Sequence, residues 1–148
     1  MLRPWWAQGA LAATAGGLYT VRGYNESEVA GDNAVIASAE YRYHIARALP
    51  VREPGKFLGQ PFRWAPDQRY GQPDWDFVVK AFTDAARVTN SNKQSFERDE
   101  SLWSVGIGFD LLYKRNASLR MDWGLALKDA GKTESGDSRL HLVATFLY

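Results

Sequence analysis

The sequence contains no cysteine, only two histidines and almost no excess of one charge. The absence of cysteine excludes disulfides, thiolate catalysis and zinc sites built on cysteine. His44 and His141 have no second ligand at metal spacing. Lys and Arg total 18 against 17 Asp and Glu, a net charge of +1. That balance gives no electrostatic reason to expect nucleic acid as a partner.

Catalytic and membrane-helix patterns are also missing. No serine has a histidine and an aspartate in a recognisable arrangement, and the Gly-x-Gly at 106–108 lacks the third glycine and the helix of a phosphate loop. The carboxylates Glu26, Glu28 and Asp32 do not have EF-hand spacing, so a solvated loop is favoured over a calcium site. No apolar run approaches the ~20 residues of a membrane helix. We therefore expect no enzyme, no cofactor and no metal site.

The sequence is rich in aromatic residues and in segments that alternate apolar and polar residues. Phe, Trp and Tyr make up 14% of the chain, and such residues serve both in packed cores and in the girdles of membrane barrels. The mean hydropathy of −0.38 is typical of a soluble protein. It does not exclude a barrel, because strands that alternate apolar and polar residues average to such a value.

Period-2 alternation predicts about five to six antiparallel strands. In the clearest segment, 104–113, Val105, Ile107 and Phe109 share one face, while Gly108 and Asp110 share the other. The predicted strands are 33–45, 75–88, 104–113, 119–128 and 139–148. The predicted connections are 46–74, 89–101 and 129–138, the first of which suggests an ordered excursion. The sequence thus predicts an all-β antiparallel meander.

The composition of the polar face separates two kinds of sheet. A soluble antiparallel sheet usually places Lys, Glu and Thr on its solvated face. Here that face mixes Gly, Ser and Ala with opposite charges such as Arg120 and Asp122, which suits a crowded, hydrated lumen. We therefore expect Val105, Ile107, Phe109 and Leu125 to face lipid. A small soluble β-sheet binding module is the alternative.

Four segments carry a resemblance to a known family. Gly16–Tyr24 reads GGLYTVRGY, Gly31–Asp32 precedes Ala39–Arg42 (AEYR), Phe82–Ala86 reads FTDAA, and the chain ends Phe146–Tyr148. In this order they resemble the VRG[YF] and F-x-D motifs and the terminal aromatic signal of two-partner secretion transporters. These are the haemolysin activators of the outer-membrane insertase superfamily.

The resemblance implies a transmembrane β-barrel of about sixteen strands in the full-length family. Residues 1–148 are then a single C-terminal barrel segment. Residues 1–32 supply a partial strand and the VRGY lid loop, and residues 33–148 the last five strands. The signal peptide and POTRA domains of the family are not expected here, so the chain reads as a fragment. An open sheet leaves unsatisfied edges in lipid, and the chain alone is not expected to be a competent pore.

The implied function is secretion and activation of a haemolysin- or adhesin-like partner protein through a pore in the bacterial outer membrane. The implied partners are outer-membrane lipid, the secreted protein and the barrel-assembly machinery. A barrel insertase of the same superfamily is the close alternative.

The resemblance also assigns a buried ion pair. In the family, the VRG[YF] motif tips a loop that folds back into the lumen, so Arg22 is a cation in a partly enclosed space. An unpaired charge there is costly, and Arg22 needs a carboxylate. Asp84 is the partner by motif. Glu40 is the second candidate, because the alternation places it on the lumen face.

Five further residues have roles implied by the same resemblance. Gly23 permits a tight reversal of the chain. Tyr24 and Phe82 pack around the ion pair. Phe146 and Tyr148 form the assembly signal, which the barrel-assembly machinery recognises by strand addition.

Overall fold

The computed structural model describes residues 13–90, 99–114 and 116–147. Within these ranges the chain forms strands and one 3-10 turn, η2, and no α-helix. The strands are β1 (Ala13–Ala15), β2 (Val29–Gly31), β3 (Asn33–His44), β4 (Gly55–Phe57), β5 (Gln60–Phe62), β6 (Trp75–Thr89), β7 (Glu100–Tyr113), β8 (Ala117–Ala126) and β9 (Ser138–Phe146), and η2 is Ala46–Ala48. The predicted all-β fold is confirmed.

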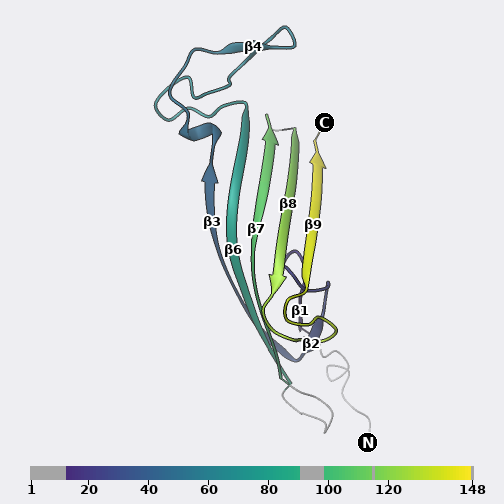
Figure 1. The fold of residues 1–148 in the computed structure, drawn as a ribbon. Helices are drawn as coiled ribbons and strands as arrows, with labels where there is room; N and C mark the ends of the chain where they lie inside the picture. The colour runs from purple at the N-terminus through teal and green to yellow at the C-terminus, as the bar shows by residue number, and fades with distance from the viewer. Residues whose placement is uncertain (1–12, 91–98, 115, 148) are drawn as a thin grey trace, which may run out of the picture. The chain divides into compact units, whose positions relative to one another are not determined.

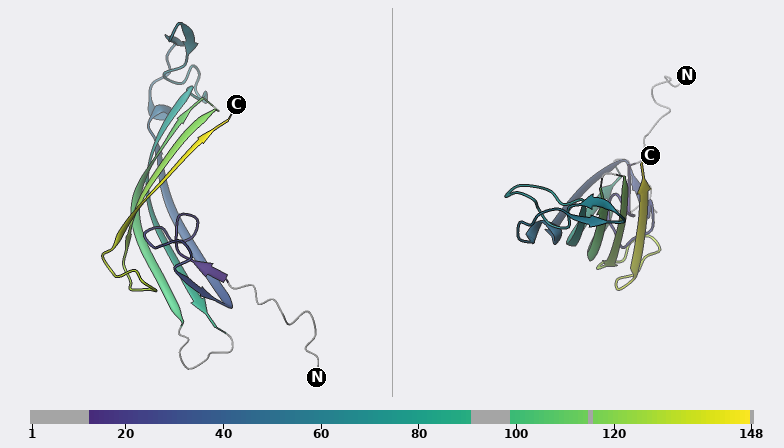
Figure 2. Two further views of the ribbon diagram at one scale, coloured as in Figure 1. Left: turned by 90° about the vertical axis from the view of Figure 1, so that its right-hand side faces the viewer. Right: turned by 90° about the horizontal axis from the view of Figure 1, so that it is seen from above.

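The five long strands form one sheet in the order β3-β6-β7-β8-β9. Neighbouring strands run antiparallel, and they lie side by side in every view (Figures 1 and 2). The predicted meander is therefore confirmed. The prediction of a strand over 119–128 was shifted by two residues toward the C-terminus, because β8 begins at Ala117 and ends at Ala126. Beyond it, the Lys128 amide and carbonyl bond to the Tyr24 hydroxyl.

The chain divides into two compact units, and each contains part of the long strands. The first unit consists of Met1–Ala39, Thr83–Val105 and Gly124–Arg139, and the second of Glu40–Phe82, Gly106–Trp123 and Leu140–Tyr148.

The first unit has a hydrophobic core around β1 and β2. These two strands pair antiparallel, with Ala13 opposite Gly31 and Ala15 opposite Val29. The segment between them, loop 16–28, contributes Val21 and Tyr24 to the core, and neither side chain is exposed. The core consists of Ala15, Val21, Tyr24, Val29, Ala86, Val88, Leu102, Ala126 and Ala130. The loop is therefore a packed part of the unit.

In the second unit, the connection over 46–74 contains a small hairpin. Strands β4 and β5 pair antiparallel, with Gly55 opposite Phe62. Leu58 and Gly59 between them have φ of 49° and 80°, as a type I′ hairpin turn requires. Four rings from the hairpin and its neighbours pack in tilted, edge-on or stacked pairs: Phe57, Phe62, Trp64 and Tyr113. The connection is thus ordered, as its composition suggested.

Burial along β7 is the reverse of that in a soluble sheet. Polar and small residues are buried, including Ser104 and Asp110. Large apolar residues on the other face are open, with Trp103 47% and Ile107 48% exposed. Neighbouring strands add further exposed apolar side chains: Val35, Tyr41, Tyr43, Leu119, Trp123, Leu140, Leu142 and Phe146. In water this face would be an apolar patch of the kind that marks an interaction surface.

Candidate functional site: a loop fastened by a buried ion pair

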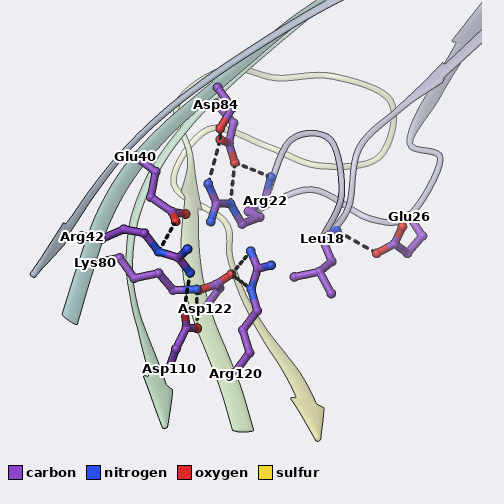
Figure 3. A network of polar contacts seen from close by, with 11 residues as sticks. Leu18, Arg22, Glu26, Glu40, Arg42, Lys80, Asp84, Asp110, Arg120 and Asp122 are labelled. Carbon is purple, nitrogen blue, oxygen red and sulfur yellow. Dashed lines mark hydrogen bonds and ion pairs between the residues drawn. The ribbon is translucent and has the colours of Figure 1, made fainter. Parts of the chain in front are cut away.

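Arg22 in loop 16–28 and Asp84 on β6 form a bidentate ion pair within the first unit (Figure 3). Arg22 Nε donates to Asp84 Oδ2 at 2.7 Å, and Nη2 donates to Oδ1 at 3.0 Å. The Arg22 backbone amide donates to Oδ2 at 3.1 Å. This parallel geometry is the strongest that arginine and a carboxylate adopt, because the planar guanidinium fits both oxygens.

The pair is almost completely enclosed. Arg22 is 4% exposed and Asp84 1%. The Ser38 hydroxyl on β3 donates a further hydrogen bond, 2.6 Å long, to Asp84 Oδ1. Burying two charges is costly, and only good geometry and full hydrogen bonding offset that cost. Here the carboxylate has four donors, so either residue would be left in an unfavourable state without the other.

Two glycines allow the loop to lie directly on β8. Gly23 has φ of 101°, a conformation that favours glycine. A Cβ on Gly124 of β8 would lie 2.7 Å from Gly23 N and 2.8 Å from the Arg22 carbonyl carbon. No side chain fits in that space. The backbone of the loop therefore contacts the backbone of the strand.

Tyr24 ties the loop to the ends of two strands. Its hydroxyl lies 3.0 Å from the Trp103 carbonyl and 2.8 Å from the Lys128 carbonyl, and the amides of both residues donate to it at 3.2 and 3.3 Å. A hydroxyl has one proton and two lone pairs, so it donates to one carbonyl at a time. The ring itself belongs to the core.

Glu28 fastens the other side of the loop. Its Oε1 accepts hydrogen bonds from the backbone amides of Lys132 and Thr133, the latter at 3.1 Å. Partial burial acts to raise the pKa of Glu28, but hydrogen bonds from Lys132, Asn25 and Thr133 outweigh it. The pKa therefore lies below its usual value of 4.5. Glu26 performs a similar task, since its Oε1 accepts the Leu18 amide at 2.8 Å.

Low pH is expected to weaken the hydrogen bonds that Glu28 accepts from the Lys132 and Thr133 amides. A lowered pKa means that Glu28 stabilises the folded loop above pH 4.5, and that this contribution disappears as the pH falls through the lowered pKa. Hydrogen exchange at the Lys132 and Thr133 amides, corrected for the intrinsic rate, should accelerate over that range. Glu28→Gln should exchange fast at every pH and lose the pH dependence. A pH-dependent rate that survives in Glu28→Gln would show that another group is responsible.

The second unit contains a separate charged network on the polar face, centred on Lys80 (Figure 3). Lys80 Nζ lies 2.7 Å from Asp110 Oδ1 and 2.8 Å from Asp122 Oδ1, and its side chain is not exposed at all. These distances make two ion pairs across β6, β7 and β8. Gly108 on β7 leaves the necessary room, because a Cβ there would lie 2.1 Å from Asp122 Oδ1.

Three further residues complete this network. Arg120 approaches Asp122 Oδ2 with Nε and Nη2, each at 2.7 Å. Arg42 binds Asp110 through Nη2 and lies 3.1 Å from Glu40 through Nε. Three cations thus meet three carboxylates, and the network is neutral.

The positions of the site residues can be compared with the roles predicted for them. The structure brings Arg22 and Asp84 together, as the motifs implied. The packing of Tyr24 and Phe82 around this pair stays a prediction. Glu40 binds Arg42, and its role as second acceptor for Arg22 stays a prediction. The Phe82 ring lies against Gly106, where a Cβ would be 2.3 Å from its Cζ.

At the end of β9, Phe146 is 76% exposed, and Tyr148 lies outside the described residues. The assembly signal therefore stays a prediction.

The sequence did not predict three of these contacts. Ser38 bonds Asp84, the Tyr24 hydroxyl bridges two strand ends, and Lys80 organises the second network. Alternation can assign Ser38 and Lys80 to a face of their strands, but it does not give the register that selects their partners.

Comparison with known proteins gives no relative. No family model, no curated protein and no solved structure matches the chain. None of the helices in the described ranges is long and apolar enough to cross a membrane. What the chain does must therefore be inferred from its own residues.

Proposed function

We propose that the chain forms part of an outer-membrane pore of the two-partner secretion type, in which loop 16–28 lies in the lumen. The observation that carries the proposal is the buried pair of Arg22 and Asp84. These are the two charged residues that the VRGY and F-x-D segments single out, and they lie 62 positions apart in the chain. A chance surface arginine would have little reason to meet that aspartate with both nitrogens in a closed site.

The distribution of side chains supports a membrane location. A lipid-facing strand needs an outer apolar band and a polar inner face. Exposed Trp103, Ile107 and Trp123 suit lipid, while buried Lys80 and Asp122 suit an enclosed polar interior. A soluble module would place the same apolar residues in water, where each loses its burial energy.

The proposed pore passes an unfolded partner protein to the cell surface without catalysis or nucleotide. The loop occupies the space through which the partner moves, so it must be displaced during transport. A buried ion pair suits this task, because it holds one geometry firmly and is lost as a unit. The apolar end of β9, with Phe146 exposed, offers an edge for the barrel-assembly machinery.

Spin labels test the two faces. The sequence has no native cysteine, so Leu142→Cys and Thr145→Cys each give one labelling site on β9, on opposite faces. In lipid bilayers the label at 142 should be relaxed mainly by oxygen dissolved in the lipid, and the label at 145 mainly by a water-soluble nickel complex. Equal accessibility of both labels to the two reagents, or the reverse pattern, would exclude the proposed orientation.

A further inference from the structure

The second unit contains a cavity of about 350 Å³ with an unusual balance of polar groups. Four basic side chains line it: Arg42, His44, Arg47 and Arg120. Asp76, Asp110 and the Ser118 hydroxyl also contribute to the lining. The cavity takes no part in fastening loop 16–28, and the inference below does not depend on the proposed function.

Asp76 is only half satisfied. Its Oδ2 accepts from His44 Nδ1 at 2.6 Å and from Arg47 Nε at 3.1 Å. Its Oδ1 is buried and has no hydrogen-bond partner among the described residues. Such an oxygen is costly to bury, and it requires a donor from outside the protein.

The guanidinium groups that line the cavity have unused hydrogen-bond donors. Arg47 uses only Nε on Asp76, so its terminal nitrogens keep donors that no described residue receives. Arg47 and Arg42 each have about half of the side chain exposed. Asp110 is not a free acceptor for Arg47, because it already binds Lys80 and Arg42. The cavity therefore offers several donors and one vacant acceptor.

We propose that this cavity binds a phosphate group that presents a hydroxyl. The phosphate oxygens accept from Arg47 and its neighbouring guanidinium groups, which match oxyanions in geometry. The hydroxyl donates to Asp76 Oδ1. In free inorganic phosphate the donor is its own proton, and in a sugar phosphate it is a neighbouring sugar hydroxyl.

Asp76 also makes the site selective. Sulfate has similar size and shape but carries no proton near neutral pH, so it can offer nothing to Asp76 Oδ1. Two unprotonated oxyanions would then face each other in a partly buried space, which is unfavourable. A site built to receive a hydrogen bond rejects a ligand that lacks the donor.

Calorimetric titration of the full chain in detergent micelles tests the site, with inorganic phosphate, glucose 1-phosphate and sulfate at equal ionic strength. Phosphate should bind at least about tenfold more tightly than sulfate, the value of one charge-assisted hydrogen bond. Tighter binding of the sugar phosphate would identify a sugar-linked source, and equal binding would identify free phosphate. Failure of both phosphates to bind, or equal binding of sulfate, would overturn the proposal.

Variants locate the binding and identify the selective group. Asp76→Asn introduces an amide donor, so it should bind sulfate and reduce the preference to within a factor of about two. Arg47→Met should weaken phosphate about tenfold and leave Asp76 in place. Arg52→Met removes an exposed arginine outside the cavity lining and should change nothing. Loss of binding in Arg52→Met equal to that in Arg47→Met, or unchanged selectivity in a folded Asp76→Asn, would contradict the site.

Discussion

Arg22→Ala is expected to release loop 16–28 from the first unit while the five-stranded sheet persists. Asp84 would then be a carboxylate 1% exposed without its cation, and breaking such a pair costs about 3 kcal/mol. Protection of the residue-22 amide, which donates to Asp84 Oδ2, against hydrogen exchange should fall about 100-fold. Amides in the middle of β7 should keep their protection, because their partners are untouched.

A double-mutant cycle separates a pair from two independent effects. Asp84→Ala should give the same loss as Arg22→Ala, and the double variant should be no worse than either. Arg87→Ala is the matched control, since Arg87 lies on β6 and is exposed, and it should stay within about 0.5 kcal/mol of the parent. Additive losses in the cycle would mean that the two residues do not act together.

Lys80→Met should destabilise the second unit by about 3 kcal/mol or more. The change keeps most of the side-chain volume but leaves Asp110 and Asp122 as neighbouring buried carboxylates without the cation between them. Like charges at such distances repel strongly in a site with little water. Urea unfolding, monitored by hydrogen exchange of the amides in β6–β8, would measure the change in the free energy of unfolding.

Lys56→Met is the control for that experiment. Lys56 is an exposed lysine on β4 with the same chemistry, so its replacement should change stability by less than about 0.5 kcal/mol. Adding Asp122→Asn to Lys80→Met should restore part of the loss, because one uncompensated charge is removed. No recovery in the double variant would show that the Lys80 effect comes from packing and not from charge.

The sheet could be predicted from the sequence because alternation in 104–113 and its neighbours sets both strand and face. The ion pair was predicted from the motif resemblance and not from alternation, because only the resemblance connected Arg22 to Asp84. Local pattern gave no sign of Ser38 as a donor, because which β3 residue lies beside Asp84 depends on register. The short strands β1 and β2 were not predicted, because three residues are too few for an alternating pattern to be recognised.

The Lys80 network illustrates the same limit. Lys80, Asp110 and Asp122 each look like ordinary polar-face charges in their own strands. Only the pairing of β6, β7 and β8 brings them together. Gly108 leaves the room that they need, because a Cβ there would lie 2.1 Å from Asp122 Oδ1 and 2.8 Å from Lys80 Cε.

The Tyr24 hydroxyl makes departure of the loop an all-or-none event. One hydroxyl accepts from the amides of both Trp103 and Lys128 and donates to one of their two carbonyls at a time. When the tyrosine leaves, those backbone groups lose their partner together, and water must replace it. A loop held only by surface contacts would detach gradually from its tip. This one should instead occupy two sharply distinct populations, seated or fully withdrawn, with few molecules between them.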